Sequence, residues 1–350
     1  MLRPSSFIRL VLGTCLTFLL LTPVLAHVVT VPASPSEKSA GVTSEAITTN
    51  PSPNVTLVTT ADESVYNRAY RRVMGNFQIM DAAGALLEDR GKGFVYVTAG
   101  RGENGVSSIG GGRYVSAENL SSNVQISEFT GFLFPDEPLD YTAAWIVQKV
   151  RPSEYPGEAE SPTEAVLERY TLVNLFTYVE MDGFRWYQIG ENRWVHQFNV
   201  AKVVPIARPA DMETDKWISV DLYEQVMIAY EGDTPIFATL VASGLPEWAT
   251  PEGLFYVYLR VERVAMVGAE GKPDFYYLQD VPWNMFFKDD VALHGTYWHD
   301  GFGYRHSHGC VNLSLADASW LYNWSADETD TAAEDDKGMG VYVYSSGAYK

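Results

Sequence analysis

Hydrophobic and polar residues alternate in short runs along most of the chain after about residue 63. These runs are rich in Val, Tyr, Phe and Trp and are separated by Gly, Asp and Asn, which is typical of strands joined by tight turns. One segment differs, because apolar residues recur at helical spacing after Ser314, and Ser314 with Asp317 makes a capping box. The pattern therefore predicts a mainly β protein with one clear helix near its C-terminal end.

The first 62 residues lack this alternation. Arg3 and Arg9 precede an apolar run at 10–21, and small residues follow up to Ala26, which is typical of a secretory signal peptide cleaved near Ala26. The apolar run is shorter than the ~18 residues that a membrane-spanning helix needs. Residues 27–62 are rich in Ser, Thr and Pro, so we expect a disordered linker there. The predicted location is extracytoplasmic, either secreted or periplasmic.

Two stretches of the following region resemble each other. Arg113-Tyr114-Val115 in the first corresponds to Arg193-Trp194-Val195 in the second, 80 positions later. Such a period predicts a duplicated small β-domain, and the hairpin of the second copy resembles the end of bacterial SH3-like domains. We therefore expect SH3-like β-domains at residues 63–150 and 151–209. Domains of this kind either contact wall glycan or serve as spacers, and both roles stay open.

Composition limits the number of domains and the class of partner. The chain has 350 residues, of which 46% are hydrophobic, which suits two or three folded domains. It carries 44 acidic against 25 basic residues, a formal net charge of −19. A surface of this sign repels phosphate backbones, so nucleic acid is not expected as a partner.

The candidate chemistry gathers near the C-terminal end. Cys15 lies in the predicted leader, which leaves Cys310 as the single thiol of the mature chain. Four of the six histidines precede it within a short segment, at His294, His299, His306 and His308. A thiol attacks well only as a thiolate and so needs a base within hydrogen-bond reach. His294 and His308 are the candidate bases, whereas we expect His299 and His306 at the surface.

The segment that begins at His294 and ends in Ser307-His308-Gly309-Cys310-Val311-Asn312 resembles the signature of the YkuD-type L,D-transpeptidases. The resemblance covers about Trp217 to Tyr344. It implies a catalytic β-sandwich at residues 215–346, after the two SH3-like domains, with one helix following the catalytic cysteine. Members of that family join or edit peptidoglycan stem peptides, which connects them to peptidoglycan biosynthesis, cell-wall organisation and cell shape.

The resemblance also implies roles for individual residues. Cys310 would be the nucleophile, His294 its base, and the carbonyl of Gly295 the group that orients His294. We expect the oxyanion donors to be the backbone N–H groups of Gly309 and Cys310. The remaining residues expected in the oxyanion site or substrate pocket are Ser307, His308, Asn312, Tyr297 as a pocket wall, and Arg305 as a partner for a stem carboxylate.

The implied reaction passes through a thioester. The thiolate attacks a tetrapeptide stem, D-Ala leaves, and the acyl group moves to an amine acceptor in cross-linking or wall attachment. Neither a metal nor an organic cofactor is expected, and carbapenems are expected inhibitors. Two alternatives stay open: a non-catalytic wall-binding adaptor, and a metal-dependent peptidoglycan peptidase, although no standard zinc pattern occurs in the sequence.

Overall fold

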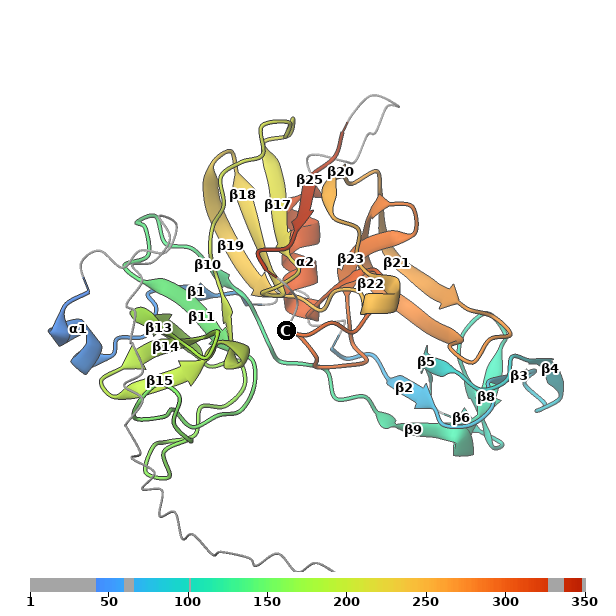
Figure 1. Cartoon of the computed structure of the whole chain (residues 1–350). Coiled ribbons are helices and arrows are strands. Elements are labelled where there is room, and N and C mark those ends of the chain that lie inside the picture. The colour runs from blue at the N-terminus through green and yellow to red at the C-terminus, as the bar shows by residue number, and fades with distance from the viewer. Residues whose placement is uncertain (1–41, 60–65, 101, 327–336, 348–350) are drawn as a thin grey trace, which may run out of the picture.

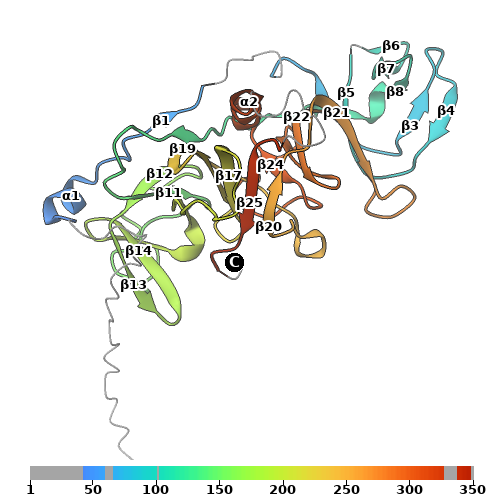
Figure 2. The same cartoon turned by 90° about the horizontal axis from the view of Figure 1, so that it is seen from above.

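We describe a computed structural model of the chain, which covers residues 42–59, 66–100, 102–326 and 337–347. A two-sheet sandwich occupies the centre, and two small β-units lie on opposite sides of it (Figures 1 and 2). Strands dominate the described part, so the prediction of a mainly β protein is confirmed. Within the described ranges, no helix is both long and apolar enough to cross a membrane.

One sheet of the sandwich, which we call the β17 sheet, has the strand order β1-β10-β19-β18-β17-β25-β20. Its strands are β1 (Thr56–Leu57), β10 (Phe132–Leu133), β17 (Lys216–Asp221), β18 (Val226–Glu231), β19 (Thr234–Leu240), β20 (Gly253–Tyr256) and β25 (Gly340–Tyr344). The C-terminal strand β25 runs parallel to β17 and antiparallel to β20. Two segments more than a hundred residues apart in the sequence therefore pair near one edge of this sheet.

The other sheet, which we call the β22 sheet, has the order β24-β23-β22-β5-β2-β9, and β21 also pairs with β22. Its strands are β2 (Tyr70–Val73), β5 (Phe94–Thr98), β9 (Leu120–Asn123), β21 (Leu259–Gly268), β22 (Tyr276–Lys288), β23 (Val291–Gly295) and β24 (Val311–Leu313). The start of β22 pairs with β5 in parallel. The sheet therefore contains strands from both the N-terminal and the C-terminal part of the chain.

The first β-unit, residues 70–123, completes β2, β5 and β9 with a small five-stranded sheet of order β4-β3-β8-β7-β6. These strands are β3 (Gln78–Met80), β4 (Leu86–Asp89), β6 (Gly102–Glu103), β7 (Val106–Ser108) and β8 (Tyr114–Ser116).

The second β-unit, residues 142–202, contains two three-stranded sheets, β12-β11-β16 and β13-β14-β15. Its strands are β11 (Thr142–Ile146), β12 (Leu172–Leu175), β13 (Thr177–Met181), β14 (Phe184–Gly190), β15 (Arg193–His196) and β16 (Val200–Lys202).

The two β-units share a local arrangement. In each, a strand leads into a single 3₁₀ turn and then into the last strand, with the turns η2 at Ala117–Asn119 and η3 at Gln197–Asn199. The turns lie 80 positions apart, which is the offset that the sequence comparison found. In each unit the last strand pairs with the first, β9 with β2 and β16 with β11. The two units therefore share this local pattern, and the duplication and the SH3-like assignment both stay predictions.

Two predicted boundaries are wrong. Strand β11 lies before residue 150 yet pairs with β12 and β16, so the second unit begins well before residue 151. Part of the expected disordered linker at 27–62 is ordered, because helix α1 (Ser44–Thr49) is capped by Thr43 and β1 pairs with β10. The pairing of β1 with β10 satisfies backbone N–H and C=O groups that would otherwise be unpaired at the edge of the sheet. The predicted signal peptide at 1–26 lies outside the described residues.

The main core lies between the two large sheets and helix α2 (Leu315–Trp324). Buried apolar side chains from β17, β18, β22, β23 and α2 form one cluster, including Ile218, Met227, Met285, Leu293 and Leu321. The side chain of Ser314 accepts a hydrogen bond from Asp317 N at 3.2 Å, so the predicted N-terminal cap of α2 is confirmed. The helix packs against β22, β23 and β24. It thereby supports β23, which carries His294, and β24, which directly follows Cys310.

Candidate active site

A cavity of about 400 Å³ opens beside β22, β23 and the residues that precede β24. Five polar residues on its wall belong to the predicted site, namely His294, Ser307, His308, Cys310 and Asn312. His306, which was expected only at the surface, also lines it, as do Asp274 and Asp290. Apolar lining comes from distant parts of the chain, including Phe94 of the first β-unit, Trp248, Phe275, Tyr276 and Trp298. A concave apolar site with a few convergent polar groups is the usual form of a binding or catalytic pocket.

The thiol of Cys310 lies on this wall, one residue before β24. Its Sγ is 3.8 Å from the carbonyl oxygen of Asp290. Burial raises the pKa of the thiol to about 11, although a hydrogen bond with the backbone of Ala292 opposes this effect. The thiol is therefore protonated at neutral pH in the empty cavity and needs a base to react.

His294 lies on β23, and its Cα pairs with that of Asn312 on β24. Residues two apart on an extended chain share a face, so Cys310 and Asn312 face the same side as His294. The Nδ1 atom of His294 lies 3.2 Å from the carbonyl oxygen of Gly295. A carbonyl only accepts, so Nδ1 carries the proton and Nε2 is the free base. This is the position that the resemblance implied for the Gly295 carbonyl.

Both members of the pair are neutral before substrate binds. Burial lowers the pKa of His294 to about 4, while the hydrogen bond to Gly295 acts in the opposite direction. Among the residues that the structure describes, no hydrogen bond joins the imidazole to the thiol of Cys310. Hydrogen bonds of this kind often tighten only in the substrate complex. The arrangement fits proton transfer during attack rather than a standing thiolate–imidazolium pair.

The backbone before Cys310 is held by Ser307. The Ser307 hydroxyl donates to the carbonyl of Cys310 at 2.5 Å and accepts from the N–H of Gly309 at 3.1 Å. Gly309 has φ +123°, a conformation that favours glycine, and its carbonyl accepts from Thr250 Oγ1 at 2.8 Å. The prediction that the Gly309 N–H is an oxyanion donor is therefore wrong, because Ser307 already binds it.

Cys310 is the remaining backbone donor of the predicted pair. It lies outside β24, and its N–H makes no hydrogen bond with any residue in the described ranges. That N–H is free to bind a developing oxyanion.

Two predicted pocket residues lie elsewhere. Tyr297 is fully buried, stacks on Tyr70 with ring centroids 3.7 Å apart, and donates its hydroxyl to the carbonyl of Gln279 at 2.6 Å. It belongs to the main core, which Tyr70 of the first β-unit also enters. Arg305 is half-buried and does not line the cavity, whereas the next residue, His306, does and has its backbone tied to Ser243.

His308 forms part of an aromatic rim. It is exposed, and its ring lies 4.0 Å from that of Trp248 and 5.1 Å from that of Tyr276, measured between centroids. Trp298 also lines the cavity, and its ring centroid lies 5.7 Å from that of His294. Sequence reasoning missed Trp248 and Tyr276, because they come from segments far from the motif and carry no local signal.

The prediction that His299 lies at the surface is also wrong. Its ring is half-buried and stacks on His306 at a centroid distance of 3.9 Å. Nδ1 accepts from the N–H of Gly301 at 2.9 Å, and Nε2 lies 2.9 Å from the side-chain amide of Asn312. Burial, reinforced by the neighbouring His306, His294 and Arg169, lowers the pKa of His299 to about 2. His299 is thus a neutral imidazole that contacts the side chain of Asn312, a residue of the cavity wall.

In the part of the chain that the structure describes, no three His, Cys, Asp or Glu side chains are grouped so that they could hold a metal ion.

Known proteins resemble this part of the chain. Residues 215–343 match the YkuD family, described as the L,D-transpeptidase catalytic domain. The putative L,D-transpeptidase YciB of Bacillus subtilis is 30% identical over 121 residues, and the match covers 30% of this chain and 59% of that protein. The chain therefore spans less than two-thirds of the length of this relative.

Solved structures give similar matches. The catalytic domain of an E. faecium L,D-transpeptidase acylated by ertapenem is 26% identical, covers 38% of this chain and 99% of that one, and has a TM-score of 0.31. L,D-transpeptidase 3 from Mycobacterium tuberculosis, in complex with a faropenem-derived adduct, is 16% identical, covers 63% and 92%, and has a TM-score of 0.32. The family match, together with the His294 and Cys310 motif, identifies residues 215–343 as an L,D-transpeptidase catalytic domain of the YkuD type.

Proposed function

We propose that this protein is an exported cysteine L,D-transpeptidase that acts on peptidoglycan tetrapeptide stems through a thioester. One observation carries the proposal: Cys310 and a neutral His294, whose Nδ1–H is held by Gly295, line the same cavity. Nucleophilic acyl transfer by a thiol needs this pairing of a nucleophile with an oriented base.

The first half-reaction cleaves the amide between the third and fourth stem residues. Sγ of Cys310 attacks the carbonyl carbon while Nε2 of His294 accepts the thiol proton. The same proton then passes to the leaving nitrogen, so D-Ala departs as an amine and a thioester remains on Cys310. Because the two groups are neutral in the empty cavity, proton transfer accompanies attack.

The second half-reaction transfers the acyl group to an amine. His294, now neutral again, accepts a proton from the incoming amine as its nitrogen attacks the thioester, and the proton returns to the sulfur. The aromatic rim of Trp248, Tyr276 and His308 narrows the access of water, which favours transfer over hydrolysis. An amine of a second stem gives a cross-link, and an amine of a protein gives attachment to the wall.

The proposed setting is outside the cytoplasm and associated with the cell wall, after cleavage near Ala26, with the β-units in reach of glycan. The leader pattern of the sequence supports export. Adducts of ertapenem and of faropenem on the related enzymes support acylation of Cys310 by carbapenem-type inhibitors.

A turnover assay tests the proposal. The mature chain, residues 27–350, is incubated with a disaccharide tetrapeptide, and free D-Ala and cross-linked product are separated by chromatography. We expect both products with the wild type, none with Cys310→Ala or His294→Ala, and normal yield in the presence of a chelator. His196→Ala, a histidine of the second β-unit, is the matched control and should keep full activity. Activity that survives in Cys310→Ala, or that a chelator abolishes, would contradict the proposal.

A further inference from the structure

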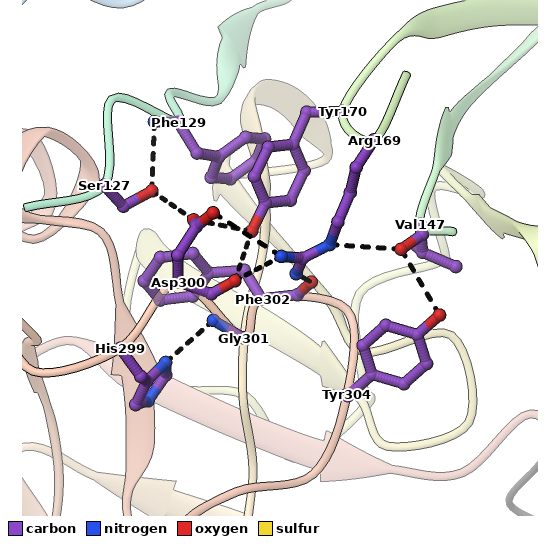
Figure 3. Close-up of polar contacts among 10 residues, drawn as sticks. All are labelled: Ser127, Phe129, Val147, Arg169, Tyr170, His299, Asp300, Gly301, Phe302 and Tyr304. Carbon is purple, nitrogen blue, oxygen red and sulfur yellow. Dashed lines mark hydrogen bonds and ion pairs between the residues drawn. The ribbon is translucent and has the colours of Figure 1, made fainter. Parts of the chain in front are cut away.

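The loop between His294 and Cys310 is held from outside the catalytic domain. Arg169 of the second β-unit donates through Nε to the carbonyl of Val147 at 3.1 Å and through Nη2 to the carbonyl of Phe302 at 2.5 Å (Figure 3). Its Nη1 donates to the carbonyl of Asp300 and forms an ion pair with the Asp300 carboxylate at 3.5 Å. One guanidinium therefore fixes two backbone positions of the loop at once.

Asp300 receives further support from two hydroxyl groups. Tyr170 donates to Asp300 Oδ1 at 2.8 Å, and Ser127 donates to the same oxygen at 2.5 Å (Figure 3). Tyr170 adopts φ +70°, a conformation that costs free energy for a side chain of its size, so the surrounding contacts must hold it there. Its ring packs against Phe129 and under the Arg169 guanidinium. We call Arg169, Tyr170 and Asp300 the clamp.

The residue next to the clamp on the chain is His299, and its proton can be placed. Nδ1 accepts from the backbone N–H of Gly301, so Nδ1 has no proton (Figure 3). A neutral imidazole carries one proton, which must then be on Nε2. The pKa of about 2 agrees with a neutral ring. Nε2 is consequently a hydrogen-bond donor.

This donor determines how the amide of Asn312 is turned. The structure places the amide nitrogen of Asn312 2.9 Å from His299 Nε2. Two donors cannot share a hydrogen bond, so we infer that the amide is turned the other way and that its oxygen faces Nε2. Amide oxygen and nitrogen have the same shape, and their assignment follows from the hydrogen bonds. The NH₂ group then occupies the other branch, which is buried and has no partner among the described residues. Asn312 is one of the residues that line the cavity, and a buried donor without a partner in the cavity wall is the kind of group that a ligand satisfies.

We propose that His299, held by the clamp, is a positioning residue that turns the Asn312 NH₂ group into the cavity as a donor to the acyl carbonyl oxygen. This inference rests on the proposed function. When the thiolate attacks, the carbonyl π electrons move to oxygen, and the resulting oxyanion accepts hydrogen bonds from Asn312 and from the N–H of Cys310. Asn312 thereby supplies the second donor that Gly309, bound to Ser307, does not. The second β-unit reaches the reaction through two intermediates, His299 and Asn312.

Two electrophiles separate this role from a merely structural one. Ertapenem acylates through a tetrahedral oxyanion, whereas iodoacetamide alkylates the thiol without one. We measure both rate constants on the mature chain by intact-protein mass spectrometry. His299→Phe, which removes the donor, should slow acylation about 100-fold, the usual loss of one oxyanion donor, and leave alkylation within about twofold. His299→Gln keeps a donor and should recover most of the acylation rate.

The clamp gives a second, graded pair of variants. Arg169→Leu should also slow acylation, but by less than His299→Phe does. The acylation rate of Arg169→Lys should lie between those of Arg169→Leu and the wild type, because lysine keeps the positive charge but lacks the planar set of donors of the guanidinium. Lys149→Leu, on an exposed position of the same unit, is the matched control and should change neither rate. Asn312→Leu, which removes the amide at similar size, reports on the donor even where His299→Phe does not fold.

The outcomes divide cleanly. Equal slowing of both rates in His299→Phe and Asn312→Leu, or no slowing in either, overturns the positioning role. A wild type that iodoacetamide alkylates but ertapenem does not acylate overturns the proposed function itself, whatever the variants do.

Discussion

The two β-units share a strand–turn–strand pattern, yet they join the catalytic domain in different ways. The first unit pairs β5 with β22 through main-chain hydrogen bonds, and Tyr70 stacks on Tyr297 inside the shared core. The second unit keeps its strands in sheets of its own and contacts the catalytic domain chiefly through side chains. Its apolar side chains share a buried cluster with the β17 sheet, and Arg169 and Tyr170 bind the loop after His294.

The two β-units therefore have different structural roles, although they share a local pattern. The first unit is part of the sheet that carries His294, and Phe94 lies on the cavity wall, so folding and cavity depend on it together. The second unit also shares a buried apolar cluster with the β17 sheet, in which Trp145 and Ala201 pack with Trp217 and Leu240. Folding therefore depends on both units, and the second unit adds polar contacts that hold the loop after His294. Similar local sequence therefore does not fix how a unit is used.

The largest effect is expected where the first unit meets β22. A Cβ on Gly93 would lie 2.4 Å from the ring of Phe275 and 2.5 Å from its carbonyl oxygen. Gly93→Val should lower the free energy of unfolding by about 3 kcal/mol or more, because overpacking at a backbone contact forces the strands apart. Urea denaturation gives the value. Gly100→Ala, with its nearest neighbour at 3.7 Å, is the control and should cost less than about 1 kcal/mol. A mild effect at Gly93 would show that the joint is not needed for folding.

A slightly smaller loss of stability is expected where helix α2 binds the segment between the two units. Asp317 is buried and accepts hydrogen bonds from the N–H of Gly131 at 2.8 Å and from Thr239 Oγ1 at 2.6 Å. Asp317→Ala leaves both donors unsatisfied and should cost about 2–4 kcal/mol in urea denaturation.

The same residue predicts a pH dependence. Burial raises the pKa of Asp317 to about 6, above its ordinary value of 3.8, although its hydrogen bonds to Thr239, Gly131 and Ser314 act in the other direction. The folded state thus binds the proton more tightly, so this contribution to stability is present below pH 3.8 and is lost as the pH rises through about 6. The wild type should therefore gain stability relative to Asp317→Asn between pH 7.5 and pH 4.5, measured as a difference in Tm. A constant difference would contradict the raised pKa.

The next effect concerns the thiol that the first unit helps to bury. With a pKa of about 11, alkylation of Cys310 by iodoacetamide should speed up about tenfold for each pH unit between 7 and 9, because only the thiolate reacts. Phe94→Ala opens the cavity wall and should raise the rate at pH 7. A rate that is flat from pH 6 upward would instead indicate a standing ion pair with His294.

The smallest effect is expected on the exposed side of the second unit. Lys149 Nζ pairs with Glu168 at 2.7 Å, but both side chains are about two-thirds exposed. Lys149→Ala should change the free energy of unfolding by about 0.5 kcal/mol or less, as for other exposed ion pairs. A loss above about 1 kcal/mol would mean that the second unit depends on surface charge more than its buried contacts suggest.

Local patterns predicted the strands, the cap of α2 and the 80-residue repeat, because each depends on residues close in the sequence. The motif located the cavity wall at His294, Cys310 and Asn312. It could not predict that Ser307 binds the N–H of Gly309, since that depends on the path of a short loop. The pairing of β5 with β22 also escaped prediction, because strands about 180 residues apart leave no local signal. The burial of Tyr297, expected in the pocket, and the partial burial of His299, expected at the surface, escaped prediction for the same reason.

Intact-mass analysis of the mature chain with the disaccharide tetrapeptide tests the central claim most directly. We predict an added mass equal to the donor less D-Ala, mapped by peptide digestion to Cys310 and absent from Cys310→Ala. An adduct on another residue, or release of D-Ala by the wild type with no covalent species and undiminished in Cys310→Ala, would contradict the account.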